Sequence, residues 1–340
     1  MKSMHSASRR YFLKGALMGA AALRAGGGRE LLAAAERGAT AAKSRVVLAR
    51  DALLRGTAST PGSSIDSGRM LALLDRSMQA LFDRDHPIEA WRMLVQPGEL
   101  VGLKVNALGG RGISSNLQLV EAICERLREA GIKAGDIVVW DRDSEEMERA
   151  GFHISTSGNG VLCFGTDRVD YEEELVAYGS VGSRLSKNLT QRSNVLINVP
   201  VLKDHDGAGV TMALKNMYGV IHNPNKYHPN GCNPYIADLN MLPEIRTRMR
   251  LIICDATTAM YEGGPGYKPE HSWHHNGLIV SQDPVALDYT GWQIIERKRA
   301  EKGLKTLEAE DRAPHYIATA ADAEHRLGTN DPKRISMVEV

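Results

Sequence analysis

The chain has little of what marks several common protein classes. It contains 4 cysteines in 340 residues, which excludes a fold built on disulfide bonds. Aromatic residues make up 5% of the chain, and no apolar run approaches the roughly 18 residues of a membrane-spanning helix. Lys and Arg (42) nearly balance Asp and Glu (41), so the charge gives no reason to expect a nucleic-acid partner. What is present, 43% hydrophobic and 24% charged residues, is an ordinary globular composition.

The first residues have the pattern of an export signal. Residues 8–14 read SRRYFLK and are followed at 15–23 by a Gly- and Ala-rich segment too short to span a bilayer. An arginine pair in this setting is typical of a twin-arginine signal. We expect a cleaved signal peptide at 1–35, a linker at 36–45 and a single α/β domain at 46–340. The expected partner is then the twin-arginine translocase, and the protein is expected in the periplasm, or otherwise exported, with no stable membrane span.

Short apolar runs alternate with amphipathic segments along the chain. The apolar runs predict strands at 46–49, 100–105, 137–140, 195–199, 251–254 and 278–280. Apolar residues at three- and four-residue spacing predict helices at 67–83, from Ser114 or Ser115 to Gly131, and at 209–218, 234–247 and 284–300. Strands that are apolar throughout are typical of sheets covered on both faces. We therefore expect an α/β fold with a mainly parallel sheet and helices on both faces, a doubly wound, three-layer arrangement.

Polar residues follow the predicted strands. In an open α/β sheet, ligands bind beyond the carboxyl ends of the strands, a rule that selects Lys104, Asn106, Asp141, Lys203, Asp255 and Asp283. The segment 198–219 adds a Gly-containing loop before a helix, whose free N–H groups would favour an anion. We expect the substrate-binding residues to be Lys104, Asn106, Lys203, Lys215, Asn216 and Asp283. The alternative is that both loop lysines are solvated and the glycines make a turn.

Histidines are the second chemical signal. Imidazole transfers protons near neutral pH and is a common ligand of zinc and iron. We expect catalysis by His205 and His228, which flank the anion loop, with Asp255 orienting the base. A metal ion, iron or zinc, is expected on a set drawn from His205, His228, His271, His274 and His275. Neutral histidines in solvent-facing loops are the alternative. The sequence has no HExxH motif and no paired cysteines, and therefore no ferredoxin-type iron–sulfur motif.

Five blocks in a fixed order carry a family resemblance. They are LKVN at 103–106, NVPVLK at 198–203 with His205, ALKN at 213–216 through Gly219, EGGPG at 262–266 after Asp255, and DPVALD at 283–288. With these blocks the chain resembles the domain of unknown function 362 family over about residues 46–300. The resemblance implies an α/β fold and export by the twin-arginine route. Some family members carry an iron–sulfur module, which favours redox chemistry, although this chain lacks the cysteine run of such a module.

These observations together predict an exported periplasmic enzyme that acts on a small anionic substrate. The expected chemistry is of oxidoreductase type and depends on a metal or cofactor. Two alternatives stay open. One is a non-catalytic periplasmic protein that binds a ligand or a metal with the same pocket. The other is a racemase or isomerase that uses lysine and histidine as paired acid and base groups.

Overall fold

The computed structural model describes residues 43–56 and 64–340, so the predicted twin-arginine signal at 1–35 lies outside the described residues. Residues 44–340 form one compact unit. Its main sheet contains β1 (Ser44–Arg50), β2 (Val101–Val105), β3 (Ile137–Trp140), β4 (Leu162–Cys163), β7 (Val195–Val199), β8 (Val201–His205), β9 (Gly209–Thr211), β10 (Met249–Met260), β11 (Ser272–Ser281) and β12 (Ile335–Glu339). A separate hairpin pairs β5 (Val176–Tyr178) with β6 (Val181–Ser183).

The helices lie between and beyond these strands. They are α3 (Ser67–Phe82), α4 (Pro87–Leu94), α5 (Leu117–Glu129), α6 (Ser144–Ala150), α7 (Lys187–Thr190), α8 (Ala213–Asn216), α9 (Tyr235–Asn240), α10 (Pro243–Arg246), α11 (Pro284–Glu301) and α12 (Tyr316–Ala321). Among the described residues, none of these helices has both the length and the apolarity that crossing a bilayer requires.

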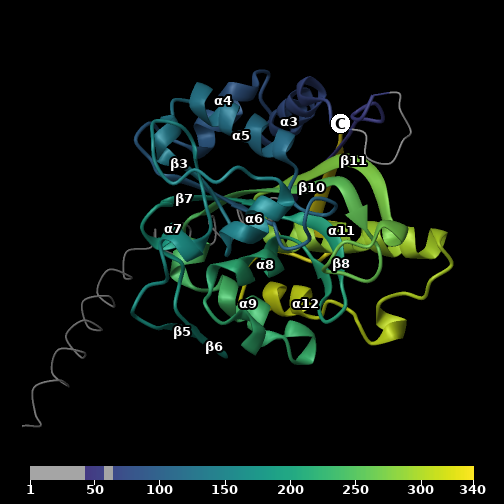
Figure 1. Ribbon diagram of the computed structural model, residues 1–340. Coiled ribbons are helices and arrows are strands. Elements are labelled where there is room, and N and C mark those ends of the chain that lie inside the picture. Colours follow the sequence, from purple (N-terminus) through teal and green to yellow (C-terminus); the bar gives the residue numbers. More distant parts are fainter. Residues whose placement is uncertain (1–42, 57–63) are drawn as a thin grey trace, which may run out of the picture. The chain divides into compact units, whose positions relative to one another are not determined.

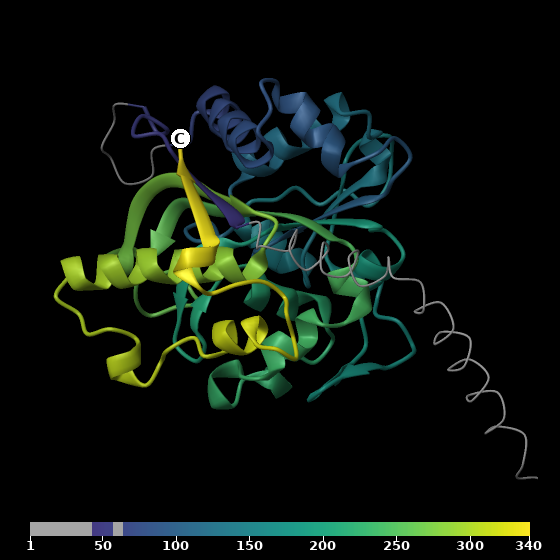
Figure 2. The ribbon, with the colours of Figure 1, turned by 180° about the vertical axis from the view of Figure 1, so that it is seen from behind.

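The sheet is mixed and mostly parallel, as the apolar strand pattern predicted. Its order is β12-β1-β11-β10-β7-β2-β3-β4, and β8 continues beside β10 where β7 ends at Pro200. β11 runs antiparallel to both of its neighbours, and β9 runs antiparallel to β8. The yellow strand β12 lies beside the purple β1 (Figure 2). The carboxyl ends of β2, β3 and β8 therefore share one edge, and the carboxyl end of β11 lies at the opposite edge.

Helices cover both faces of the sheet. α3, α4 and α5 lie on one side, and α8, α9, α11 and α12 lie on the other (Figure 1). Neighbouring strand residues point to opposite layers: Leu196 belongs to the hydrophobic core with α8 and α12, and Ile197 belongs to the core with α3 and α5. Both side chains are fully buried. This two-sided burial is the reason why the strands are apolar throughout, and it confirms the α/β fold.

Capping residues set several helix ends. The Asp66 carboxylate accepts a hydrogen bond from the Arg69 N–H at the start of α3, and Asp283 accepts from Val285 and Ala286 at the start of α11. The start of α5 is capped by Asn116, one residue beyond the predicted Ser114 or Ser115.

Two of the predicted helices are wrong in part. The segment 209–218 begins as strand β9, and α8 starts only at Ala213, before a short 3₁₀ turn. The predicted helix 234–247 is divided into α9 and α10, with Pro243 at the first position of the second helix. Proline is tolerated at the first position of a helix because the N–H that it lacks would have no intrahelical partner at that position.

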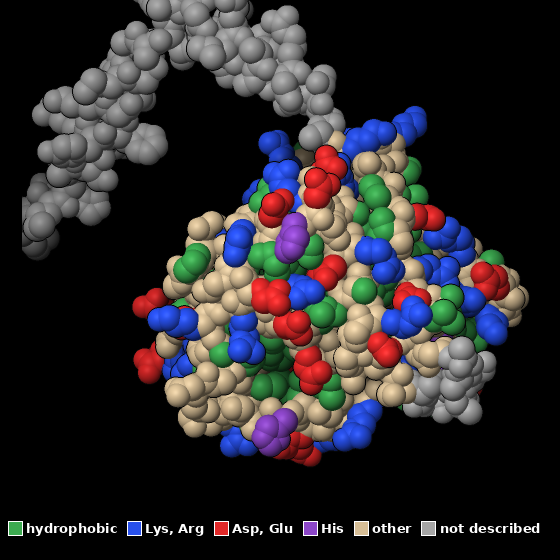
Figure 3. Space-filling model, turned by 90° about the horizontal axis from the view of Figure 1, so that it is seen from above, with side chains coloured by type: hydrophobic (Ala, Val, Ile, Leu, Met, Phe, Trp, Pro, Cys, Tyr) green, Lys and Arg blue, Asp and Glu red, His purple; other side chains and the backbone are tan. Residues whose placement is uncertain are grey.

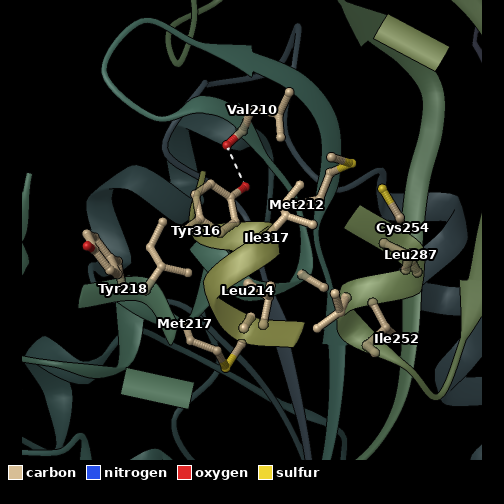
Figure 4. Close-up of a cluster of buried hydrophobic side chains, with 14 of the residues drawn as sticks. Val210, Met212, Leu214, Met217, Tyr218, Ile252, Cys254, Leu287, Tyr316 and Ile317 are labelled. Atoms are coloured by element: carbon tan, nitrogen blue, oxygen red, sulfur yellow. Dashed lines mark hydrogen bonds between the residues drawn. The ribbon is translucent and has the colours of Figure 1, made fainter. Parts of the chain in front are cut away.

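Helix α12 packs against the β8–β9 hairpin and α8 and holds them in place. Tyr316 and Ile317 of α12 pack against Met212, Leu214 and Met217 in the core drawn in Figure 4, and the Tyr316 hydroxyl donates a hydrogen bond to the Val210 carbonyl (3.1 Å). All of these side chains are 1% exposed or less. A packed support of this kind holds the side chains above it in defined positions.

Candidate functional site

A cavity of about 450 Å³ opens at the shared carboxyl edge of the parallel strands. The lining comes from β2 and β8, from the residues that follow β3, from α8 and from the segment after α8. Its polar lining includes eight residues that the sequence selected, which are Lys104, Asn106, Asp141, Lys203, His205, Lys215, Asn216 and His228. The structure therefore brings together side chains that lie more than a hundred residues apart in the sequence.

Lys104 and Asp141 form an ion pair at the base of this cavity. The Lys104 Nζ atom lies 2.7 Å from Asp141 Oδ1, and both side chains are nearly fully buried. The other Asp141 oxygen accepts a hydrogen bond from the Ala107 N–H. Burial lowers the pKa of Lys104, while the nearby carboxylate of Asp141 acts in the opposite direction. The pair consists of one cation and one anion, so the pair itself adds no net charge to the cavity.

Amide side chains connect this pair to a second lysine. Asn216 Oδ1 accepts hydrogen bonds from Asn106 Nδ2 (3.0 Å) and Lys104 Nζ (3.3 Å), and Asn216 Nδ2 donates to Asn198 (2.7 Å). Asn106 Oδ1 in turn accepts from Lys203 Nζ (2.9 Å). These amides satisfy buried ammonium groups without adding a negative charge.

Lys203 is fully buried, and it donates hydrogen bonds to two neutral oxygens, the Asn106 Oδ1 atom and the Ile113 carbonyl. Burial lowers the pKa of Lys203 to about 7, and the charges of Lys104 and Lys215 contribute to the decrease. At neutral pH this amine is therefore close to the midpoint of its titration.

Lys215 stands on α8 beside His228 and Tyr218. Its Nζ atom lies 3.2 Å from His228 Nε2 and 3.8 Å from the centre of the Tyr218 ring. Burial lowers the pKa of Lys215 to about 8. Burial also lowers the pKa of His228, and the adjacent Lys215 charge acts in the same direction. Both effects favour a neutral imidazole that accepts a hydrogen bond from the lysine.

His205 stacks against His228, with ring centres 5.9 Å apart. Its Nδ1 atom accepts hydrogen bonds from the N–H groups of Gly207 and Ala208, at 3.1 and 3.2 Å. Burial lowers the pKa of His205 to about 3, and Lys215 and His228 add to this shift. A neutral imidazole whose Nδ1 is an acceptor carries its proton on Nε2. His205 can therefore donate a hydrogen bond through Nε2.

The predicted anion site at the 207–211 backbone and the helix start is wrong. β9 pairs with β8 through 209–211, and the N–H groups of Ala213 and Leu214 donate to the buried Asp288 carboxylate at 2.7 and 3.1 Å. The side chain of Asp288, supplied by α11, thus occupies the helix start. The lysine ammonium groups carry the positive charge of the cavity.

Asp255 and Asp283 lie outside the cavity, so the prediction that they share it is wrong. Asp255 lies within β10, where its carboxylate accepts hydrogen bonds from the N–H groups of Asn116 and Thr257. Asp283 follows β11, which runs antiparallel to its neighbours, and its side chain binds Ser44 and caps α11. A reversed strand places its carboxyl end at the far edge of the sheet.

The five-histidine metal site does not form. His274 and His275 line a different cavity together with Trp273 and Arg50, and His271 packs edge-on against Tyr261. Because β10 lies between β8 and β11, two strand spacings of about 5 Å separate these residues from His205.

Among residues 43–56 and 64–340, one group of three potential metal ligands comes together, formed by Asp204, Asp206 and Glu262. Arg312 forms ion pairs with all three carboxylates. This arrangement is an ion-pair cluster.

Some lining residues were missed by sequence reasoning. Tyr218 supplies the ring beneath Lys215, and Gly219 packs so closely that a Cβ atom there would lie 2.7 Å from Lys104 Nζ and 2.8 Å from Asp141 Oδ1. The block that ends at Gly219 contained the only available signal, a glycine directly after a predicted site.

The fold and this lysine-lined cavity define an α/β protein with a ligand site at the carboxyl edge of its sheet. The chain belongs to the family described as domain of unknown function DUF362, whose model matches residues 101–293. That range contains every polar lining residue discussed above. No curated protein matches the chain.

A crystal structure of a protein from Thermotoga maritima, determined by a structural genomics consortium, is similar to this chain with a TM-score of 0.37 and 10% sequence identity. The match covers 72% of this chain and 61% of that one. The chain thus spans less than two thirds of the length of that protein.

Proposed function

We propose that this protein is an exported enzyme that binds a small anion, a carboxylate or a phosphate, in the cavity and transfers protons on it. One observation carries the proposal: three buried lysines surround one cavity, and among the described residues a carboxylate forms an ion pair with Lys104 but with neither of the other two. Arg142 and Glu146 at the lining balance each other in a 2.6 Å ion pair. Lys203 and Lys215 thus leave up to two positive charges for a ligand to neutralise.

Because these charged lysines are buried, the cavity favours an anion as its ligand. Two unpaired ammonium groups in a low-dielectric cavity are costly, and an anion that enters recovers that cost through close hydrogen bonds. The imidazole of His228 lies beside Lys215 and can accept a proton from it, and His205, stacked on His228, can donate a hydrogen bond to a ligand through Nε2. The acid and base groups and the anion site occupy one cavity, which favours an enzyme over a binding protein.

The test begins with binding. Calorimetry of the purified protein with lactate, succinate and inorganic phosphate should show that at least one anion binds, and that Lys215→Met abolishes the signal. Lys133→Met is the matched control, because Lys133 is exposed in the turn that precedes β3, at the other edge of the sheet. Equal binding by Lys215→Met and wild type, with both variants folded, would refute the proposed site.

Turnover separates the enzyme from the non-catalytic alternative. If the cavity transfers protons, a bound carboxylate should exchange the hydrogen on its neighbouring carbon with deuterium from the solvent, which proton NMR detects. A ligand that binds without exchange, and without any other change over hours, would favour a binding protein. The redox chemistry and the export route stay predictions of the sequence.

A further inference from the structure

We propose that Lys215 forms an imine with the carbonyl group of a small 2-oxo acid. This inference rests on the proposed anion site and names its substrate class. The geometry is that of an activated nucleophile: an amine within hydrogen-bond reach of a base, with the base oriented by a third group. Lys215 supplies the amine, His228 the base, and the rings of His205 and Tyr218, which pack against His228, orient it.

Lys215 is placed as a nucleophile. Its side chain reaches the cavity and is 7% exposed, whereas Lys203 is fully buried and Lys104 is paired with Asp141. Within the described residues no carboxylate forms an ion pair with Lys215, and such a pair would keep the amine protonated. The Tyr218 ring, 3.8 Å away, fixes the ammonium position. Burial among these groups, which lowers the pKa of Lys215 to about 8, increases the fraction of neutral amine.

His228 is placed as the base. Its Nε2 atom lies 3.2 Å from Lys215 Nζ, and an ammonium group can only donate a hydrogen bond. The nitrogen facing the lysine is therefore the acceptor. A proton can move from the ammonium to His228, and return from His228 to the substrate oxygen.

The chemistry balances without an oxidant or a reductant. The neutral Lys215 nitrogen attacks the carbonyl carbon, a C–N bond forms, and the carbonyl π electrons move to oxygen, which takes a proton from His228. In the second step His228 takes a proton from the nitrogen of this adduct and passes it to the hydroxyl group. The C–O bond then breaks, water leaves with the bonding electrons, and the nitrogen lone pair forms the C=N bond. The product is a protonated imine, which draws electrons from the neighbouring carbon and eases proton loss there. The deuterium exchange proposed above would follow from this step.

The substrate carboxylate has its own partner. Lys203 on β8 lines the same cavity as Lys215 on α8, and its ammonium lacks a carboxylate among the described residues. A 2-oxo acid carries a carboxylate next to its carbonyl group, so it presents an anion to one lysine and an electrophile to the other. A cavity of about 450 Å³ holds a ligand of this size.

Borohydride trapping tests the imine. The full-length protein is incubated with pyruvate, glyoxylate or 2-oxoglutarate and then with cyanoborohydride, which reduces an imine to a stable amine. The expected result is a mass gain of one oxo acid minus one oxygen atom, located on Lys215 by peptide mapping. Lys215→Arg keeps the charge and should bind the acid without being labelled. His228→Asn should slow labelling about 100-fold, and Lys133→Met should label like wild type.

The outcomes distinguish the two proposals. Binding of an oxo acid with no label, or a label on Lys203 instead, overturns the imine and leaves the anion site intact. Binding of lactate, succinate or phosphate while all three oxo acids fail also overturns the imine. Failure of every anion to bind overturns the anion site itself.

Discussion

The Lys104 ammonium lies 2.7 Å from the Asp141 carboxylate, with side chains 1% and 7% exposed. The two residues come from neighbouring parallel strands, because Lys104 pairs with Trp140, the residue before Asp141. This buried ion pair anchors the base of the cavity, and its neutrality leaves the excess positive charge to Lys203 and Lys215.

Removal of one partner should be costly. In Asp141→Asn the Lys104 charge stays buried without a counter-charge, so we expect the free energy of unfolding to fall by about 3–5 kcal/mol, measured by urea denaturation. The double variant Lys104→Met with Asp141→Leu should recover most of that loss because no buried charge remains. A single variant as stable as wild type would show that the pair does not contribute to stability.

Gly219 should tolerate no side chain. A Cβ atom would lie 2.7 Å from Lys104 Nζ, so Gly219→Ala must displace the ion pair, and we expect a loss of about 1–3 kcal/mol. Gly207→Ala is the control, because its Cβ would make an ordinary 3.7 Å contact with the His205 ring and should change stability by about 0.5 kcal/mol or less. Urea midpoints of the two variants test this contrast, and equal midpoints would contradict it.

Anion binding and protein stability should depend on pH in opposite directions. The pKa values of Lys203 and Lys215 are about 7 and about 8 in the folded protein, below the 10.5 of a free lysine. Affinity for an anion should fall as pH rises through 7 to 8, because both ammonium groups lose their charge. Over the range from about pH 7 to 10 the unfolded chain binds more protons, so stability should rise. Calorimetric titration and urea denaturation across this range test both signs, and binding independent of pH would contradict the first.

His325 should contribute stability at low pH. Burial lowers the pKa of His325, but the hydrogen bonds to Asp238 (3.0 Å) and Asp322 (2.9 Å) together raise it by more. The net pKa therefore lies above 6.5. The contribution is complete below the unfolded pKa near 6.5 and is lost as pH rises through the folded pKa. His325→Gln should therefore destabilise the protein more at about pH 5.5 than at about pH 8.5. The exposed His153, changed to Gln, is the control. A pH-independent effect of His325→Gln would contradict the ion pairs.

The strength of each pattern explains which elements were predictable. β3 and β7 are uninterrupted apolar runs, and their bounds agree with the prediction. β8 was not predicted because three of its residues, Lys203, Asp204 and His205, are polar, so the segment does not have the apolar pattern of a strand although all of it is buried. β12 was not predicted because buried and exposed residues mix along this edge strand, so it does not form an apolar run.

The location of the site was also predictable in part. Parallel strands bring their carboxyl ends to one edge, so residues after β2 and β8 were expected to meet, and the cavity contains both. The same rule failed for Asp283 because nothing in an apolar run shows the direction of a strand.

Charged side chains on the outer surface carry less information. On the face shown in Figure 3, Lys and Arg side chains are interspersed with Asp and Glu. The cavity differs because its buried lysines outnumber their carboxylate partners, which leaves an excess of positive charge.

The sequence alone determined the layer architecture, since alternating apolar strands and amphipathic helices can bury their surfaces only as a covered sheet. It also determined which residue types stand at the strand ends. The tertiary structure decided strand direction and pairing, because these depend on contacts between distant segments. It thereby decided that Lys203, Lys215, His205 and His228 meet in one cavity, that Asp288 occupies the start of α8, and that His271, His274 and His275 lie elsewhere.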